Sequence, residues 1–105
     1  MIDRKEQLLI EFVTEARKRI RGMLARDRLL LDFLVKHWEF GETKVEAADA
    51  LTASKLNVLI QLDDTLSVLS VMLRLSRFTY RREGMTIYFN FPSLEKKIAK
   101  LGGGK

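Results

Sequence analysis

The stretch from Asp63 to Phe91 constrains the fold most strongly, because it joins an apolar helix to a pair of strands without a break. The apolar run Leu66–Phe78 has the length of a helix, and Asp63-Asp64-Thr65 in front of it are typical of a helix start. No Gly or Pro separates this run from the alternating residues that follow. The alternation predicts a β-hairpin with a tight turn. Its parts are Thr79–Arg82, Glu83-Gly84 and Met85–Phe91.

Helix 64–77 carries very few polar side chains. On a helical wheel four of them fall on one narrow strip, and mainly apolar residues cover the remaining circumference. The strip consists of Ser67, Ser70, Arg74 and Arg77. A helix this apolar is expected to be buried on more than one side. In the hairpin, alternation places Met85, Ile87, Phe89 and Phe91 on one face, with Arg81 and Arg82 at the tip.

Helical patterns precede and follow this stretch. Apolar periodicity predicts helices over Asp3–Leu24, over Asp27–Phe40 with Asp27 as the cap, and over Ser93–Leu101. Thr43-Lys44-Val45-Glu46 has the form of a capping box, which predicts a further helix from Lys44 to Leu62. That segment forms either one helix or two, because Thr52-Ala53-Ser54 could interrupt it with Ser54 as a new cap.

A helix that leads directly into a hairpin, with earlier helices to cradle it, resembles the winged helix-turn-helix DNA-binding superfamily over roughly residues 27–91. The resemblance implies one mainly α domain with a small β-hairpin, covering residues 1–105. Residues 1–25 would form an N-terminal helical arm, 27–91 the winged-helix body, 93–101 a C-terminal helix and 102–105 a flexible tail.

In that family the recognition helix enters the major groove and the wing contacts phosphate or the minor groove. The resemblance implies that helix 64–77 is the recognition helix and 79–91 the wing. The implied DNA-binding residues are Ser67, Ser70, Arg74, Arg77, Arg81 and Arg82.

The charge balance also favours nucleic acid as a partner. The net charge is +5 with a pI of about 9.7, and a basic excess attracts phosphate. A basic run near the end of the first helix offers possible phosphate contacts, or is simply a solvated face. The run consists of Arg17, Lys18, Arg19, Arg21, Arg26 and Arg28.

Several classes of function are disfavoured by composition. The chain has no Cys and one His, and it contains no Ser-His-Asp set, no phosphate-binding glycine pattern and no metal-ligand spacing, so we expect no enzyme, cofactor or metal. Asp63-Asp64 is the only adjacent carboxylate pair, and helix capping explains it. No apolar run approaches the roughly 20 residues of a membrane span, and the start lacks a signal-peptide core, so we expect a cytoplasmic protein. Many charged residues and few Asn and Gln suggest a heat-adapted source.

Two functional hypotheses follow. The first is a small dimeric transcriptional regulator that binds duplex DNA. The alternative is a winged-helix protein-interaction or adaptor module with no DNA contact; it is favoured if the cations scatter over the surface rather than share one face. The first helix either packs on its own domain or forms the interface of a homodimer. The residues of that predicted interface are Leu9, Phe12, Val13, Ala16 and Ile20.

Overall fold

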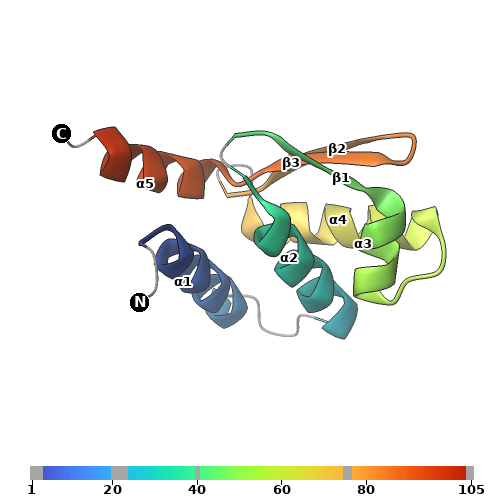
Figure 1. The fold of residues 1–105 in the computed structure, drawn as a ribbon. Coiled ribbons are helices and arrows are strands. Elements are labelled where there is room, and N and C mark those ends of the chain that lie inside the picture. The colour runs from blue at the N-terminus through green and yellow to red at the C-terminus, as the bar shows by residue number, and fades with distance from the viewer. Residues whose placement is uncertain (1–3, 20–23, 40, 75–76, 104–105) are drawn as a thin grey trace.

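The computed structural model describes residues 4–19, 24–39, 41–74 and 77–103. This part of the chain is mostly helical, with one small antiparallel sheet, as the sequence predicted (Figure 1). In chain order the elements are α1 (Arg4–Arg19), α2 (Ala25–His37), β1 (Thr43–Glu46), α3 (Ala47–Ser54), α4 (Leu59–Leu73), β2 (Thr79–Glu83), β3 (Thr86–Asn90) and α5 (Pro92–Gly103).

The sheet has the strand order β1-β3-β2, and both pairs are antiparallel. β2 and β3 form the predicted hairpin, in which Glu83 lies opposite Thr86. The two turn residues are therefore Gly84 and Met85, one position later than predicted. Gly84 has a φ of +59°, a conformation that glycine adopts without strain and that two-residue hairpin turns require.

The prediction of a helix starting near Lys44 was wrong, because Thr43–Glu46 is a strand. The residues resemble a capping box, but the Thr43 hydroxyl is used upstream: it donates to Glu39 O at 3.0 Å and accepts the Glu39 N–H at 2.9 Å. The strand is stabilised by pairing with β3, more than forty positions away, and the helix begins only at Ala47.

The segment after β1 forms two helices, which decides between the two alternatives. Lys55 ends α3 in the left-handed conformation, with a φ of 57°, and Val58 is the N-cap of α4. Ser54 is thus the last residue of α3 and not a cap. The Gln61 side chain accepts the Asn57 N–H at 3.1 Å, which satisfies a backbone donor just before α4.

The predicted bounds of 64–77 for the apolar helix were also wrong. α4 begins at Leu59, so Asp63 and Asp64 lie within it rather than at its start. It ends at Leu73, where Arg74 has a φ of 67° and turns the chain toward β2. The N–H of Phe78 donates to the Arg74 carbonyl at 3.0 Å and closes this turn.

The core lies between the sheet and the helices, and Figure 1 shows α2, α3 and α4 on one side of the hairpin. The alternation predicted for the hairpin is confirmed: Ile87, Phe89 and Phe91 are buried, whereas Met85 in the turn is 47% exposed. Phe91 is the centre of an aromatic cluster. Its ring centroid lies between 5.2 and 6.2 Å from those of Phe12, Phe78, Phe89 and Trp38.

Helix α1 packs on this core through Leu8 and Phe12, and Phe12 is only 6% exposed. This corresponds to the alternative in which the first helix packs on its own domain, and it leaves Phe12 unavailable to a second chain. The side chains of Leu9, Val13, Ala16 and Ile20 lie outside the described residues, so the rest of the predicted dimer interface stays a prediction.

Helices α2 and α5 differ from the sequence predictions mainly at their ends. Leu24 is the N-cap of α2, and the Asp27 carboxylate accepts its N–H from inside the helix at 3.3 Å. α2 ends at His37, before Phe40, because Trp38 is extended. α5 begins at Pro92, whose missing N–H costs nothing at a first helical position. Leu94 and Ile98 of this helix face the core, whereas Lys96, Lys97 and Lys100 are exposed.

We expect Phe91→Ala to lower the free energy of unfolding by about 3–5 kcal/mol, because it removes the ring at the centre of the aromatic cluster. Met85→Ala, a large apolar side chain in the turn, should change it by no more than about 0.5 kcal/mol. Urea denaturation followed by circular dichroism measures both. Equal effects from the two variants would contradict the assignment of the core.

Candidate functional site

The outer face of α4 is the most exposed apolar feature that the structure describes. Leu62, Leu66, Leu69 and Leu73 turn one side of the helix into the core. The opposite side presents Ile60, Asp64, Ser67 and Val71. Ile60 is 74% exposed and Val71 is 77% exposed, the highest values among the large apolar side chains described.

These four residues form a continuous stripe, which we call the α4 seam. Steps of four, three and four residues keep side chains on one face of a helix. Along the helix the seam presents an apolar residue, a carboxylate, a hydroxyl and a second apolar residue. None of these four residues is Lys or Arg, so the seam itself can bury apolar area and exchange hydrogen bonds; the exposed Arg74 follows it at the end of α4. The sequence prediction missed Ile60 because the helix was expected to start at residue 64.

Arg82 does not lie free at the hairpin tip. It belongs to β2, on the same side of the sheet as α4, and forms two hydrogen bonds with Asp63, from Nε at 2.6 Å and from Nη2 at 2.8 Å. The hydrogen bonds from Arg82 lower the pKa of the Asp63 carboxyl below its ordinary value. This two-point contact ties the hairpin to α4 and occupies a guanidinium predicted to hold DNA.

Arg81 projects from the other side of the sheet, because neighbouring residues of a strand alternate. It contacts Glu42 at 2.7 Å and Glu83 at 2.8 Å, and its guanidinium lies 4.1 Å from the centre of the Tyr88 ring. The two arginines of the predicted wing therefore point to opposite faces, and each already has a carboxylate partner.

The remaining predicted DNA contacts are spread over several elements. Arg74 is exposed at the end of α4, whereas Arg77 lies beyond the helix, 3.6 Å from Glu15 of α1. Ser67 is exposed on the seam and Ser70 is half-buried beside it. Ser67, Ser70 and Arg74 therefore lie along α4 or at its end, whereas Arg77 lies apart from them beside α1.

The basic run predicted for phosphate contact is divided between two helices. Lys18 is exposed on α1 and Arg28 on α2, while Arg26 is half-buried, 3.9 Å from Asp27. The side chains of Arg17, Arg19 and Arg21 lie outside the described residues. Residues 41–90, which include the seam and the hairpin, contain six Lys or Arg and six Asp or Glu, so the net charge of +5 belongs to the rest of the chain.

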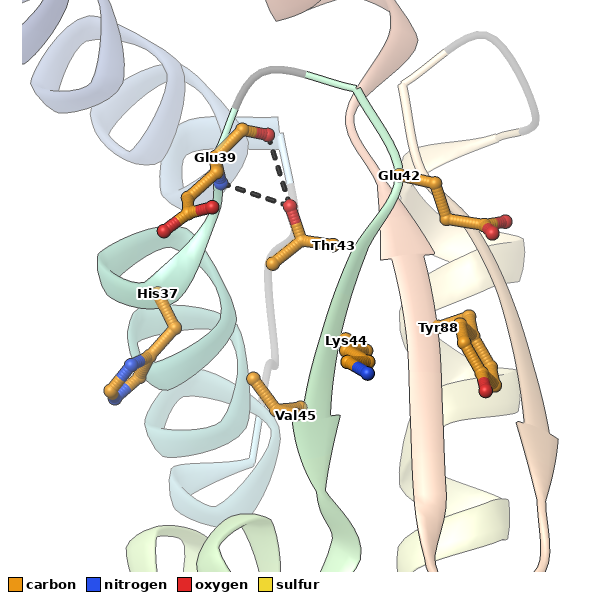
Figure 2. A pocket seen from close by; sticks show the side chains of 7 residues that line it. All are labelled: His37, Glu39, Glu42, Thr43, Lys44, Val45 and Tyr88. Atoms are coloured by element: carbon orange, nitrogen blue, oxygen red, sulfur yellow. Dashed lines mark hydrogen bonds between the residues drawn. The ribbon is translucent and has the colours of Figure 1, made fainter.

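A shallow hollow of about 520 Å³ lies beside β1, lined by residues of the α2–β1 region and by Tyr88 of β3 (Figure 2). Figure 2 shows His37 and Glu39 on one side of β1 and Tyr88 on the other. The Thr43 hydroxyl is occupied by the Glu39 backbone, and the Glu42 carboxylate by Arg81. The hollow was not predicted, because β1 was expected to be helical. Its residues are His37, Glu39, Glu42, Thr43, Lys44, Val45 and Tyr88.

No cluster of three or more His, Asp or Glu that could hold a metal ion occurs among the described residues. Within the same ranges no single helix is long and apolar enough to cross a membrane; α3 and α4 together have the length and composition, but they are bent by 79°. Comparison with protein-family models, curated proteins and solved structures found no match.

We expect Asp63→Asn, Arg82→Gln and the double variant to destabilise the fold to a similar extent at pH 7, because each breaks the same contact. The pKa of Asp63 is lowered in the folded state, so the contact stabilises the fold above the ordinary pKa of about 3.9. That contribution should disappear as the pH falls through the lowered value. Urea denaturation at a series of pH values measures the effect.

The matched control is the exposed pair Glu42 and Arg81, changed to Gln in the same way; its loss should leave stability unchanged, because exposed ion pairs contribute little. Strictly additive effects of Asp63→Asn and Arg82→Gln would show that the two groups are not coupled, and would contradict the role given to this contact.

Proposed function

We propose that this chain is a winged-helix protein-interaction module that docks through the α4 seam and does not read DNA with α4 or the hairpin. The observation that carries the proposal is the composition of the seam. Ile60 and Val71 are more than 70% exposed on a helix whose opposite side is buried in the core. Exposed apolar residues gathered on one face mark an interaction site.

The order of the elements supports the winged-helix assignment. Three helices, α2, α3 and α4, precede the hairpin, and α4 leads directly into it. In the terms of the resemblance, α4 is the recognition helix, α3 the positioning helix and β2–β3 the wing. The helix that would enter the major groove is then the helix that carries the seam.

The chemistry of that helix argues against base recognition. Arg, Lys, Asn and Gln read base edges through paired hydrogen bonds, and the seam has none of them. The Asp64 carboxylate on the seam would repel phosphate. Arg81 and Arg82 would have to leave Glu42 and Asp63 before they could contact a DNA backbone. None of these obstacles applies to the binding of another protein.

A second candidate is duplex DNA binding by a dimeric regulator, through the basic parts of the chain outside residues 41–90. The specific observation in its favour is that α5 exposes Lys96, Lys97 and Lys100. Such contacts would be made with phosphate, and the affinity would therefore fall steeply with salt.

Fluorescence anisotropy with a random duplex distinguishes the two candidates. The docking module should show no binding at about 150 mM salt, and any binding at about 50 mM should be unselective and lost as salt rises. Changing Lys96, Lys97 and Lys100 together to Ala should abolish that residual binding, because these side chains would supply the phosphate contacts. Ile60→Ser with Val71→Ser should leave it unchanged.

A duplex sequence bound selectively at 150 mM salt, with affinity lost in Ser67→Ala or Arg74→Ala, would contradict the docking proposal and favour the regulator. Circular dichroism of each variant establishes that the fold is retained.

A further inference from the structure

The α4 seam has the spacing of a coiled-coil interface. Ile60, Asp64, Ser67 and Val71 follow one another at intervals of four, three and four residues, which is the d-a-d-a spacing of a heptad repeat. Helices with this spacing bury the seam against another helix by inserting each side chain between residues of the partner. The natural occupant of the seam is therefore a helix.

The order of residues along the seam is the same in both directions: apolar, polar, polar, apolar. In an antiparallel pair of identical helices related by a two-fold axis, two residues lie opposite each other when their numbers add up to one fixed value. The two pairs of seam residues, 60 with 71 and 64 with 67, add up to the same value. Ile60 then faces Val71 of the partner subunit, and Asp64 faces Ser67 of the partner subunit. Apolar groups meet apolar groups, and each Ser hydroxyl can donate to a carboxylate.

We propose that the seam pairs with the same seam of a second copy of this chain, with the two α4 helices antiparallel about a two-fold axis. The proposal rests on the docking function above and names its partner. A two-fold pairing requires a self-complementary surface, and the seam meets this requirement in both shape and polarity.

The surrounding charges permit this approach. Residues 41–90 carry equal numbers of acidic and basic residues, so two copies can meet there without net repulsion. Asp63, beside the seam, is already neutralised by Arg82. Asp64 is the one seam residue with a charge, and it has no ion pair with any residue in the described ranges. The two copies of Asp64 would lie near the two-fold axis, where their repulsion weakens the pair.

The seam covers only about three turns of α4. A short interface with a polar centre gives a weak dimer, so we expect monomer and dimer to exchange at concentrations of roughly tens to hundreds of micromolar. A foreign helix with a basic residue opposite Asp64 is the competing occupant. The second measurement below separates it from a second copy.

The first measurement is disulfide mapping in the full chain, which has no native Cys. Chains that carry Ile60→Cys and chains that carry Val71→Cys are mixed under mild oxidation. The control is Ile10→Cys, because Ile10 is an exposed apolar residue outside the seam, on α1. The expected product is a disulfide between residue 60 of one copy and residue 71 of the other, in clear excess over 60–60, 71–71 and 10–10 products. Equal yields of all products, or 60–60 and 71–71 products alone, overturn the antiparallel pairing.

The second measurement is sedimentation equilibrium of the unmodified chain, Ile60→Asp and Asp64→Asn. Ile60→Asp should be monomeric. Asp64→Asn should dimerise more tightly, by about threefold or more, because it removes the repulsion at the axis. An unmodified chain that is monomeric at about 0.5 mM, or an Asp64→Asn variant that dimerises less well, overturns the proposal in favour of a foreign partner. The disulfide mapping and the sedimentation are independent of the anisotropy titration with duplex DNA. The proposed docking function is therefore tested separately from the identity of the partner.

Discussion

The burial of one face of β3 determines how the rest of the molecule is oriented. Ile87, Phe89 and Phe91 project to the same side and are fully buried, and Phe91 gathers aromatic rings from α1, α2 and the start of β2. Helix α4 must present its leucines to this surface, which fixes its rotation about its own axis. The seam points outward as a consequence, because a helix with one face packed against a sheet leaves the opposite face uncovered.

Electrostatic contacts within the chain then decide what the outer surface can bind. Arg82 is held by Asp63, and Arg81 by Glu42 and Glu83. The Arg82–Asp63 contact ties the hairpin to α4, and each of the two cations of the hairpin already has a carboxylate partner. Under the proposed docking function, this arrangement leaves the exposed face of α4 for protein contact. The excess positive charge of the chain is carried outside residues 41–90, notably on α5.

The sequence was sufficient for the features that depend on local pattern. The helices, the hairpin, the alternation of β3 and the start of α5 near Pro92 all follow from periodicity and from the conformational limits of single residues. Two of the failures share one cause, which is that distant pairing overrides a local signal. Thr43 to Glu46 resemble a capping box, yet they form a strand because they pair with β3. Similarly, Asp63 resembles an N-cap in the sequence, but in the fold its carboxylate accepts a hydrogen bond from Arg82, which is 19 residues away.

The site was only partly predictable for the same reason. Ser67 was assigned to the exposed strip of the helix, and it is exposed. Ile60 was hidden by a wrong helix start, because the N-cap of α4, Val58, makes no side-chain capping hydrogen bond and so leaves no capping signal in the sequence. The distant partners of Arg81 and Arg82 could not be seen, because Glu42 lies just before β1 and Asp63 lies in α4. Exposure and charge pairing at a surface are properties of the assembled fold.

The most direct test of the account is a residue-by-residue comparison of amide chemical shifts between concentrated and dilute samples of the full chain. If α4 is a docking face that pairs with a second copy, the shifts that change with concentration should centre on Ile60, Asp64, Ser67 and Val71. Residues of α5 and the buried face of β3 should not respond. Changes centred on α5, or no change along α4 at any concentration, would contradict the account.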